Sequence, residues 1–304
     1  MQHSTPGEMS ASPPQPVTAT ILAAQPEPGL YLVATPIGAA RDITLRALDI
    51  LNSADLLAAE DTRVLRRLME IHGIALRGRR IIAYHDHNAD RQRPTILRAV
   101  QEGLSVAYAS DAGTPLVADP GYRLARDVAG AGARVHALPG ASAMLAALAV
   151  SGLPSDRFMF VGFPPGAAGA KRRWIASWAE VDATVIAFES PRRVKQLLHE
   201  MPRGQGDREV VICRELTKKF EEVIRGTVSA LGESLPDEGL RGEVVVVFGR
   251  PAEAKAGNDE IRAALLTELK ESSVKDAATT VSLRMGLPRR DVYALALEVM
   301  KEDR

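Results

Sequence analysis

The sequence lacks the residues that several common kinds of site require. Among its 304 residues Cys213 is the only cysteine, which excludes an intramolecular disulfide and a zinc cluster built on cysteines. The six histidines form no His-Glu-x-x-His motif. We therefore expect no metal site and a protein of the reducing cytoplasm.

Glycine-rich phosphate loops are missing too. The turn-rich stretch at residues 34–44 has no Gly-x-Gly-x-x-Gly pattern, and Gly-Lys-Ser or Gly-Lys-Thr occurs nowhere in the chain. The glycines that let a backbone approach a pyrophosphate are therefore absent. Their absence argues against a nicotinamide cofactor and against a Walker-type nucleotide site.

The balance of charge and the lack of long apolar runs exclude further classes of protein. Lys plus Arg and Asp plus Glu both number 38, so a chain-wide basic field, as in a nucleic-acid coat protein, is excluded. The longest uncharged stretch, residues 135–155, is interrupted by proline and glycine, and its apolar middle is too short to span a bilayer. The N-terminal residues do not resemble a secretory signal.

A regular alternation begins at Gly29. Short apolar runs predict strands at residues 30–34, 55–59, 80–84, 104–109 and 134–138. Amphipathic stretches between them predict a helix from Leu45 and further helices at residues 62–71, 94–101 and 122–129. The alternation is typical of an open, largely parallel α/β sheet, whose binding site usually lies at the carboxyl ends of the strands.

Composition divides the chain into four parts. Residues 1–28 hold six prolines and no Lys or Arg, which predicts a disordered tail. An N-terminal α/β domain is expected over residues 29–153. The stretch 154–170, rich in proline and glycine, indicates a crossing into a second α/β domain over residues 154–250. After Pro251 the pattern is wholly helical, which predicts a helix-turn-helix-like module over residues 251–304.

Two loops of the first domain are rich in glycine and proline. Residues 110–121 (SDAGTPLVADPG) follow one predicted strand and residues 138–143 (LPGASA) follow the next. Gly140 allows a close approach to the backbone, and Ser142 is placed to cap the following helix. One such loop is most often a structural turn. Two at adjacent strand ends favour a ligand that is recognised through main-chain hydrogen bonds.

Two other strand ends carry charged and polar side chains. In residues 59–63 (AEDTR), the structural interpretation is that Asp61 or Thr62 caps the next helix while Glu60 pairs with Arg63. Residues 84–88 (YHDHN) have no partner cluster that could complete a metal site. A substrate-facing or general-base role is therefore favoured there.

The second domain carries three stretches of interest. In residues 188–193 (FESPRR), Ser190 and Pro191 are explained as helix-start residues, which leaves Glu189 and the two arginines without a structural role. Residues 213–222 (CRELTKKFEE) are dense in charge, which is equally typical of a solvated face. Gly242 opens the last strand and permits a close approach of the backbone.

Nine motifs together resemble one known family. They are TPIG…DIT, AEDTR, YHDHN, SDAGTP…DPG, PGASA, SGLPSDRF…GF, ESPRR, RELTKKFEE and RGEVVVV. The same motifs occur in this order in the ribosomal RNA small subunit methyltransferase I family of the tetrapyrrole methylase superfamily. The resemblance covers Gly29 to about Gly249, and the helical tail is similar to that family's C-terminal module. AEDTR, YHDHN and RELTK distinguish the RNA enzyme from the tetrapyrrole enzymes.

The resemblance implies the fold, the cofactor and the substrate. It implies a homodimer of a two-domain fold, with a largely parallel sheet, a mixed sheet and S-adenosyl-L-methionine in the cleft between the domains. The methylated group is the 2′-hydroxyl of a cytidine in the decoding region of 16S rRNA, as naked RNA or in the small ribosomal subunit. The residues expected at the cofactor are Pro36, Ala112, Gly113, Thr114, Val117, Ala141, Ser142, Phe188, Glu189, Glu215, Leu216 and Gly242. The family commonly has Asn where this chain has Ala39.

The chemistry of the residues agrees with that cofactor, because its sulfonium is attracted to carbonyl oxygens and carboxylates. The candidates for the proton acceptor are Glu60, His85, Asp86, Glu189 and Glu215. We favour His85 and Asp86 acting as one unit, because a carboxylate can orient an imidazole. RNA contacts are expected from local basic residues, namely Arg63, Arg192, Arg193, Arg214, Lys218, Arg289 and Arg290, with further candidates at residues 77–80 and 171–173.

Three alternatives stay open at this stage. The chain could be a C-methyltransferase acting on a tetrapyrrole of the precorrin or sirohaem type, which has the same fold and cofactor. It could also be a non-catalytic RNA-binding protein of ribosome assembly. The terminal module, with nine basic and nine acidic side chains in residues 255–304, fits RNA binding and a role in dimerisation or stabilisation equally well.

Overall fold

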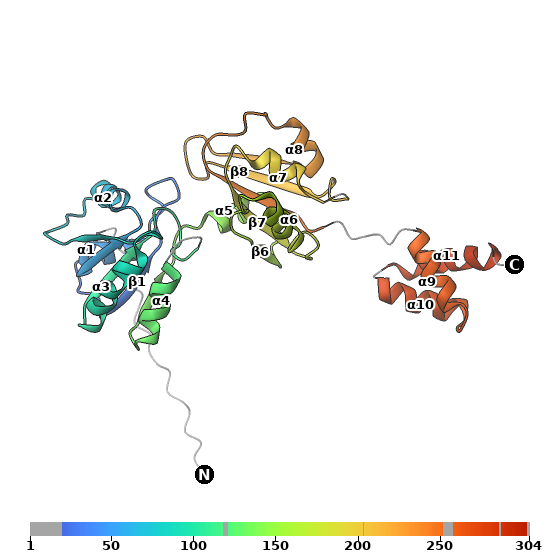
Figure 1. Cartoon of the computed structure of the whole chain (residues 1–304), viewed down its shortest axis with the longest axis horizontal. Helices are drawn as coiled ribbons and strands as arrows, with labels where there is room; N and C mark the ends of the chain where they lie inside the picture. The colour runs from blue at the N-terminus through green and yellow to red at the C-terminus, as the bar shows by residue number, and fades with distance from the viewer. Residues whose placement is uncertain (1–19, 118–120, 203, 252–257, 286, 303–304) are drawn as a thin grey trace, which may run out of the picture. The chain divides into compact units, whose positions relative to one another are not determined.

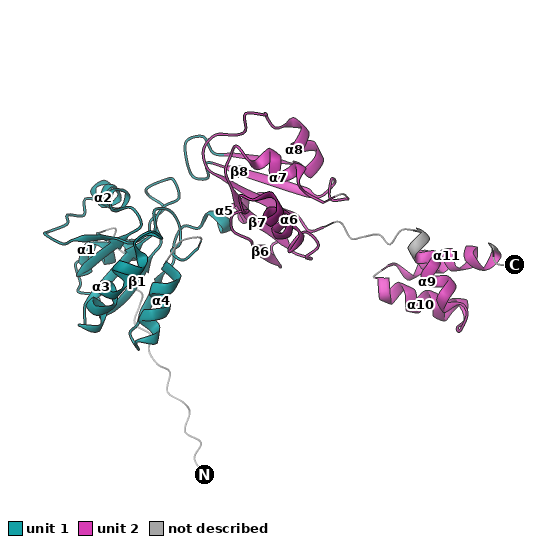
Figure 2. Cartoon of the chain, in the orientation of Figure 1, with its two compact units in different colours: residues 1–146, 215–221 teal, residues 147–214, 222–304 magenta. Residues whose placement is uncertain are grey.

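The computed structural model describes residues 20–117, 121–202, 204–251, 258–285 and 287–302 of the chain. The chain folds as two compact units, which are coloured separately in Figure 2. Unit 1 comprises residues 1–146 and 215–221, and unit 2 comprises residues 147–214 and 222–304. The segment 215–221 therefore groups with unit 1, although the chain on both sides of it belongs to unit 2. The domain boundaries after residues 28, 153 and 250 stay predictions.

Unit 1 is built on a five-stranded sheet in which all neighbouring strands are parallel. Its strands are β1 (Gly29–Val33), β2 (Leu56–Ala59), β3 (Ile81–Ala83), β4 (Ser105–Ala109) and β5 (Val135–Leu138), in the order β3-β2-β4-β1-β5. The prediction of a parallel α/β sheet is therefore confirmed. Because the strands are parallel, the five loops that follow them leave from one edge of the sheet.

Helices cover both faces of this sheet (Figure 1). They are α1 (Leu45–Ser53), α2 (Thr62–Ile71), α3 (Ala89–Gln101) and α4 (Gly121–Gly130). Helix α5 (Ala143–Ser151) follows β5 and crosses from unit 1 into unit 2 after Ala146. Alternate side chains of β1 point to opposite faces, as a strand requires. Tyr31 and Val33 pack in one core with side chains of α1 and α2, whereas Leu30 packs in the other with side chains of α3 and α4.

Helix α3 begins five residues earlier than expected, at Ala89 rather than Pro94. Proline is favoured in the first turn of a helix, because the amide hydrogen that it lacks would have no partner there. The helix was therefore predicted to start at Pro94. In the structure Pro94 lies inside the helix, and the preceding turn is closed because the Asn88 carbonyl accepts the amides of Arg91 and Gln92, both at 3.0 Å.

Residues 20–28, the last part of the predicted tail, make contacts with unit 1. Within residues 20–28, the Leu22 amide donates to Asp49 Oδ1 at 2.7 Å, and the Gln25 side chain donates to Asp55 Oδ1 at 3.0 Å. Ile21 packs against the core beneath α1. This segment docks because its polar groups find partners on and beside α1. Residues 1–19 of the predicted tail lie outside the described residues.

Unit 2 contains a mixed sheet, as the resemblance implied. Its order is β6-β7-β10-β8-β9, in which β6 and β7 are parallel and the other neighbours are antiparallel. Its elements are β6 (Phe158–Phe160), α6 (Ala168–Ala176), β7 (Thr184–Glu189), α7 (Val194–His199), β8 (Glu209–Arg214), β9 (Glu222–Thr227), α8 (Val228–Ser234) and β10 (Val244–Phe248). Side chains of α6, α7 and α8 form one core with side chains of β7, β8 and β10.

The stretch expected to be an irregular crossing holds two of these elements, β6 and α6. The prolines and glycines at residues 162–166 made the whole stretch look irregular, but they occupy only the connection between the two elements. The Trp174 indole donates to the Val161 carbonyl at 3.0 Å and fixes α6 beside the end of β6.

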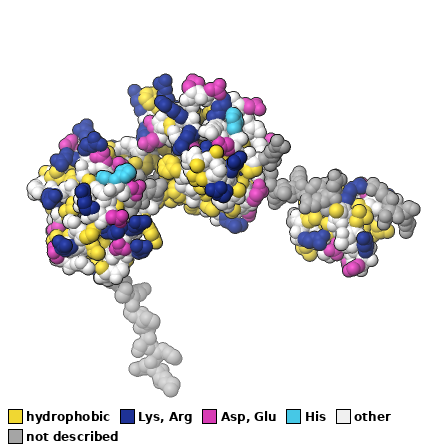
Figure 3. Space-filling view, viewed as in Figure 1, with side chains coloured by type: hydrophobic (Ala, Val, Ile, Leu, Met, Phe, Trp, Pro, Cys, Tyr) yellow, Lys and Arg dark blue, Asp and Glu magenta, His cyan; other side chains and the backbone are white. Residues whose placement is uncertain are grey.

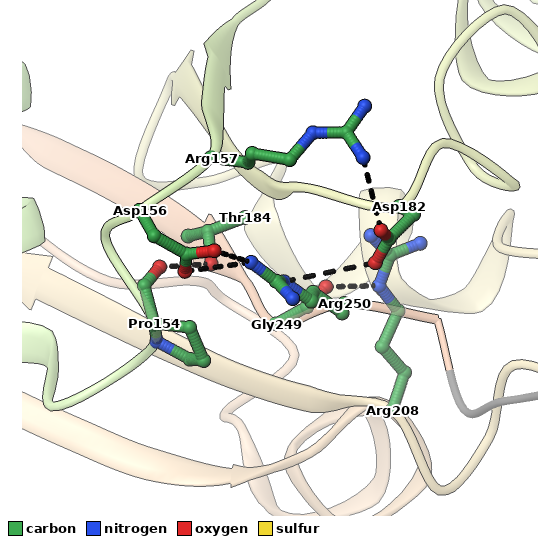
Figure 4. Close-up of polar contacts among 8 residues, drawn as sticks. All are labelled: Pro154, Asp156, Arg157, Asp182, Thr184, Arg208, Gly249 and Arg250. Carbon is green, nitrogen blue, oxygen red and sulfur yellow. Dashed lines mark hydrogen bonds and ion pairs between the residues drawn. The ribbon is translucent and has the colours of Figure 1, made fainter.

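Two arginines hold the chain where it leaves β10 (Figure 4). Arg208 is buried, and its guanidinium donates to the carbonyls of Gly249 at 2.7 Å and Ala179 at 2.6 Å. Burial lowers the pKa of Arg208 to about 10. Arg250 pairs with Asp156 at 2.6 Å. The start of the link that follows β10 is thereby fixed to unit 2.

The terminal part of the chain is helical, with α9 (Asn258–Glu268), α10 (Val274–Met285) and α11 (Arg289–Glu302). Apolar side chains of all three helices form a separate small core, which includes Leu265, Ala278, Val281 and Val292. Only two residues beyond α10 separate it from Pro288, and Gly286 lies outside the described residues. Across the described ranges of the chain, the helices are too short or too polar to cross a membrane.

Candidate functional site

The candidate site of unit 1 lies at the carboxyl edge of its sheet. The strand order places the loops after β1, β4 and β5 next to one another, and those after β2 and β3 beyond β4. The first group comprises residues 34–38, 110–117 and 139–142, and the second comprises residues 60–61 and 84–88. The two groups coincide with the glycine- and proline-rich loops and with the charged loops of the sequence.

The loops after β1 and β4 are joined by their main chains. Thr35 and Gly113 exchange two backbone hydrogen bonds, of 2.9 and 3.0 Å. The Thr35 hydroxyl donates to the Ser110 carbonyl at 3.0 Å, and the Ser110 hydroxyl donates to the Gly113 carbonyl at 2.8 Å. Gly113 has φ +81°, a conformation that favours glycine. Thr35 and Ser110 are buried, so these bonds fix the loops rigidly.

The loop after β5 joins the same group. The Thr114 hydroxyl donates to the Ala141 carbonyl at 3.1 Å. At Gly140 an added Cβ atom would lie 2.8 Å from Cβ of Ala34, so only glycine lets these two loops approach each other. Gly113, Thr114 and Ala141, all expected at the cofactor, are therefore brought together. Thr35 and Ser110, which join these loops, were not predicted as site residues, although both lie three residues before a glycine of their loop.

Segment 215–221 of unit 1 packs against the loop after β1. The Ala39 amide donates to the Thr217 hydroxyl at 3.0 Å, and a Cβ atom at Gly38 would lie 2.5 Å from Cγ of Lys218. Leu216 is buried. This chain has Ala39 where the family commonly has Asn, and the hydrogen bond to Thr217 is donated by the main-chain amide of Ala39. Two expected cofactor residues, Glu215 and Leu216, thus share unit 1 with Gly113.

The loop after β2 contains a helix cap. Asp61 caps α2 by accepting the Arg63 amide at 2.8 Å, as predicted, and it also pairs with the Arg63 guanidinium at 2.6 Å. The partner of Arg63 that the structure shows is therefore Asp61, whereas the sequence suggested Glu60. The hydrogen bond from the Arg63 side chain lowers the pKa of Asp61 to about 2. The Asp61 amide donates to Asp111 at 2.8 Å, which links this loop to the one after β4.

The loop after β3 places His85 differently from our expectation. The Asn88 side chain accepts the His85 amide at 2.9 Å and donates to the Ala83 carbonyl at 3.0 Å, which fixes its orientation. Its amide nitrogen lies 3.1 Å from Nε2 of His85, so that ring nitrogen accepts. Within the described residues Nδ1 of His85 is buried without a partner. The partner of His85 is therefore Asn88 and not Asp86, which is exposed.

In unit 2 the end of β7 carries a buried carboxylate. Glu189 Oε1 accepts the Ser190 amide at 2.6 Å and pairs with Arg193 at 2.9 Å. Its second oxygen, Oε2, is buried and has no partner in the part of the chain that the structure describes. Phe188 lies between Phe160 and Phe163, with ring centroids 4.8 and 5.3 Å away. Gly242 has φ +87° just before β10. Phe188 is half-buried and Gly242 is exposed, whereas the Glu189 side chain is buried.

The candidate RNA-binding residues fall into two sets. Arg192, Arg289 and Arg290 are exposed, and the Arg63 side chain is 89% exposed despite its pairing. Arg193, Arg214 and Lys218 pair with Glu189, Glu222 and Glu215 respectively. Of the further candidates, Arg79 donates to four backbone carbonyls and Lys171 is buried against Glu200. On the face drawn in Figure 3, basic and acidic side chains are interspersed.

The glycine- and proline-rich group fits a positively charged, phosphate-free ligand. Its hydroxyl groups at positions 35, 110 and 114 all donate to carbonyls within the group. These three hydroxyl groups therefore hold the loops together, and any ligand at this edge meets mainly the backbone of the loops. Pro36, Ala112 and Ser142 lie in the same loops. Ala112 is exposed, whereas Pro36, Ser142 and Val117, the last described residue before position 121, are half-buried.

Comparisons with known proteins agree in both parts of the chain. The family model of the Tetrapyrrole (Corrin/Porphyrin) Methylases matches residues 29–232, and that of the RsmI C-terminal HTH domain matches residues 255–299. A protein of Mesorhizobium japonicum named ribosomal RNA small subunit methyltransferase I is 48% identical over 276 residues, 90% of this chain and 92% of its own. The protein of that name in Bacillus subtilis is 35% identical, over 87% and 92% of the two chains.

Solved structures agree on the fold. A cobalt precorrin-4 methyltransferase of cobalamin biosynthesis superposes with a TM-score of 0.56 at 19% identity, over 72% of this chain and 94% of that one. A diphthine synthase gives 0.55 at 16% identity, over 72% and 89%. At such low identities the likeness concerns the fold alone.

Proposed function

The chain belongs to the ribosomal RNA small subunit methyltransferase I family of tetrapyrrole methylases, and on this premise we propose that it methylates a ribose 2′-hydroxyl. The proposed substrate is a cytidine in the decoding region of 16S rRNA, and the proposed methyl donor is S-adenosyl-L-methionine. The observation that carries the proposal is the rigid group of three glycine- and proline-rich loops at adjacent strand ends.

The residues proposed to hold the cofactor in unit 1 are those of the loops after β1, β4 and β5, together with Glu215 and Leu216. When bound, the cofactor supplies a methyl group on a positively charged sulfur. The chain's own contribution is to orient and hold the reactants, because Thr35, Ser110 and Thr114 lock the loops before any ligand arrives. Positioning of this kind can remove roughly 7–11 kcal/mol of an activation barrier.

In unit 2 we propose that Phe188, Glu189 and Gly242 also contact the cofactor. Oε2 of Glu189 supports this role, because a buried carboxylate oxygen without a partner is costly unless a ligand satisfies it. Arg193 holds the other oxygen and fixes the direction of the carboxylate. Arg193 is thus proposed to orient Glu189 as well as, or instead of, binding RNA.

For the proton acceptor the strand order changes our preference from His85 to Glu60. Glu60 follows β2, which is paired with β4, and its carboxylate accepts the Asp111 amide of the β4 loop at 3.5 Å. His85 follows β3, the edge strand, one strand farther from the cofactor loops. Its Nε2 already accepts from Asn88, so it must lose that bond before it can take a proton. We propose Glu60 as the acceptor and His85 as a neighbouring contact.

The RNA contacts are proposed at the exposed basic residues, Arg63, Arg192, Arg289 and Arg290. Arg63 follows the proposed base by three positions and stays accessible while it pairs with Asp61. The terminal module, whose helix α11 begins with Arg289 and Arg290, is proposed to bind the same RNA. We further propose that the active form is a homodimer.

A methyl-transfer assay on defined substrates tests the function. Small ribosomal subunits and naked 16S rRNA, both from a strain that lacks the endogenous enzyme, are incubated with the protein and a cofactor carrying a deuterated methyl group. Mass spectrometry of the nucleosides is expected to show labelled 2′-O-methylcytidine, and nuclease mapping is expected to place it in the decoding region.

Two other outcomes contradict parts of the proposal. Label on a base, or on another nucleoside, overturns the 2′-O-cytidine assignment but keeps RNA methylation. Label that appears only on an added tetrapyrrole overturns RNA methylation itself. Gly113→Val, which distorts the proposed cofactor loop, is the matched negative control.

A further inference from the structure

The tip of segment 215–221 presents an exposed aromatic ring beside a cation. Phe220 is 64% exposed, although phenylalanine is normally buried. The ammonium of Lys219 lies 5.5 Å from the centroid of the Phe220 ring. A cation at this distance interacts favourably with the ring face. The tip therefore offers an apolar plane and a positive charge together.

The acidic residues around the tip are all occupied. Glu215 pairs with Lys218 at 3.0 Å, Glu222 pairs with Arg214 at 2.9 Å, and Glu221 accepts the Thr217 amide. The acidic side chains of residues 213–222 thus have partners within this stretch. Among the described residues, the Lys219 ammonium beside the exposed ring has no carboxylate partner.

The segment that carries this tip is held firmly in unit 1. Leu216 is buried, and the Thr217 hydroxyl accepts the Ala39 amide at 3.0 Å. Two turn bonds close the loop, from the Lys218 amide to the Glu215 carbonyl at 2.9 Å and from the Glu221 amide to the Lys218 carbonyl at 3.1 Å. Phe220 thus lies on an ordered loop, four positions after Leu216 in the sequence. Leu216 is a proposed cofactor contact.

We propose that Phe220 and Lys219 form a stacking site for an unpaired base of the substrate RNA next to the methylated nucleotide. This inference rests on the proposed function and names a contact that the substrate makes. Aromatic rings with adjacent cations bind single-stranded RNA because every base has a face that can stack, while the cation attracts the phosphate. The unpaired Lys219 favours RNA over an apolar partner surface, which gains nothing from a free ammonium.

The test compares substitutions at two exposed phenylalanines. Phe220→Leu removes the ring but keeps apolar bulk, and Phe220→Trp restores a stacking face. Since one stacked base typically contributes enough to change binding by about 5- to 100-fold, we expect Phe220→Leu to lower kcat/KM for the RNA by a factor in that range. Phe220→Trp is expected to stay within about threefold of the native protein. Phe158→Leu, at an exposed phenylalanine of β6, is the matched control and is expected to be neutral.

Three further measurements decide the interpretation. Calorimetry is expected to show unchanged affinity of Phe220→Leu for S-adenosyl-L-methionine, so that the loss lies in the RNA. A photoreactive benzoyl-phenylalanine at position 220 is expected to crosslink to one nucleotide beside the target. Light scattering is expected to show an unchanged oligomeric state. Equal kcat/KM for Phe220→Leu and native protein, or a change of oligomeric state, overturns the stacking site.

The design separates this inference from the proposed function. If the native protein transfers no methyl group to RNA, the proposed function fails before any variant is compared. If the native protein is active and position 220 neither crosslinks nor affects the RNA kinetics, only the stacking site fails.

Discussion

Unit 1 uses two different kinds of loop along one sheet edge. The hydroxyl groups in the loops after β1 and β4 donate to carbonyls of this group of loops, as Thr35 does to Ser110 at 3.0 Å. The loops after β2 and β3 instead carry charged or titratable side chains, such as the largely exposed Arg63. The first kind is rigid, and we propose that it recognises the cofactor through the main chain. The second kind is suited to a substrate that arrives and leaves.

The two groups of loops should therefore respond differently to amino-acid substitution. A substitution in the first group acts through backbone geometry, because little side-chain chemistry faces a ligand there. A substitution in the second group acts mainly through the removed functional group, except at Asp61, whose side chain also caps the backbone of α2.

The largest effect is expected at Gly113. Gly113→Val forces a β-branched residue to φ +81° at the junction of two loops, and we expect calorimetry to detect no cofactor binding. Gly103→Val is the control, because Gly103 has φ +84° but lies at the amino end of β4 with no atom near its missing side chain. Both variants should lower the free energy of unfolding by about 1–3 kcal/mol. Retained cofactor binding in Gly113→Val contradicts a main-chain site.

The next effect concerns the proton acceptor. Glu60→Gln keeps the shape of the side chain but removes its basicity, so the single-turnover rate at saturating RNA is expected to fall by about 10²–10⁴. His85→Ala removes a neighbouring contact, and the expected fall is about tenfold or less. Cofactor affinity should stay unchanged in both variants. The reverse order of the two rates assigns the proton to His85 and contradicts the argument from strand order.

A moderate effect is expected from the cap of α2. Asp61→Ala removes the acceptor of the Arg63 amide, and we expect a melting temperature about 2–5 °C lower at pH 7. Arg63→Ala keeps that acceptor and removes only an exposed ion pair, so its melting temperature should change by less than half as much. If Arg63→Ala is equally destabilising, the ion pair rather than the cap stabilises the helix.

The pH dependence follows from the pKa of Asp61. Its pKa in the folded chain, about 2, lies below the usual value of 3.8, so its contribution to stability is complete above pH 4. That contribution is lost as the pH falls through 2. The difference in melting temperature between Asp61→Ala and the native protein should therefore shrink between pH 4 and pH 2.

The smallest effect is expected at Ala39. Ala39→Asn restores the residue that the family commonly has, while the contact made by the backbone amide with Thr217 is unaffected. Cofactor affinity should change by less than about threefold. A larger gain shows that a side chain also reaches the cofactor from this loop, which weakens the contrast between the two kinds of loop.

The sequence predicted unit 1 well, because its strands are short apolar runs separated by proline and glycine. Helix α2 begins at Thr62 as expected, since Asp61 is a strong cap. The approximate positions of the loops after β1, β4 and β5 were predicted for the same reason. Their strand order, and hence the distance of His85 from the cofactor loops, depends on long-range pairing that local sequence does not encode.

Two further features could not be predicted from local rules. Glu215 and Thr217 adopt φ values of +51° and +62°, which propensity assigns to glycine, because contacts with the β1 loop outweigh the local cost. The pairing of Arg63 with Asp61 rather than Glu60 was also hidden, because both acids lie within reach in sequence. Such choices are decided by packing around the side chain and not by spacing alone.

The grouping of segment 215–221 with unit 1 has a consequence for how the chain is made. During synthesis, unit 1 cannot be completed when residue 146 emerges, since the partner of the Ala39 amide is still 71 positions away and unmade. Residues 147–214 of unit 2 must be translated first. Contacts between segments so far apart in the sequence form slowly. A truncated product that ends at residue 146 therefore lacks segment 215–221, which contacts the loop after β1 in the complete chain. Nascent chains of this protein should stay protease-sensitive around Gly38 until residue 221 has left the ribosome, which ties the order of translation to the appearance of a working site.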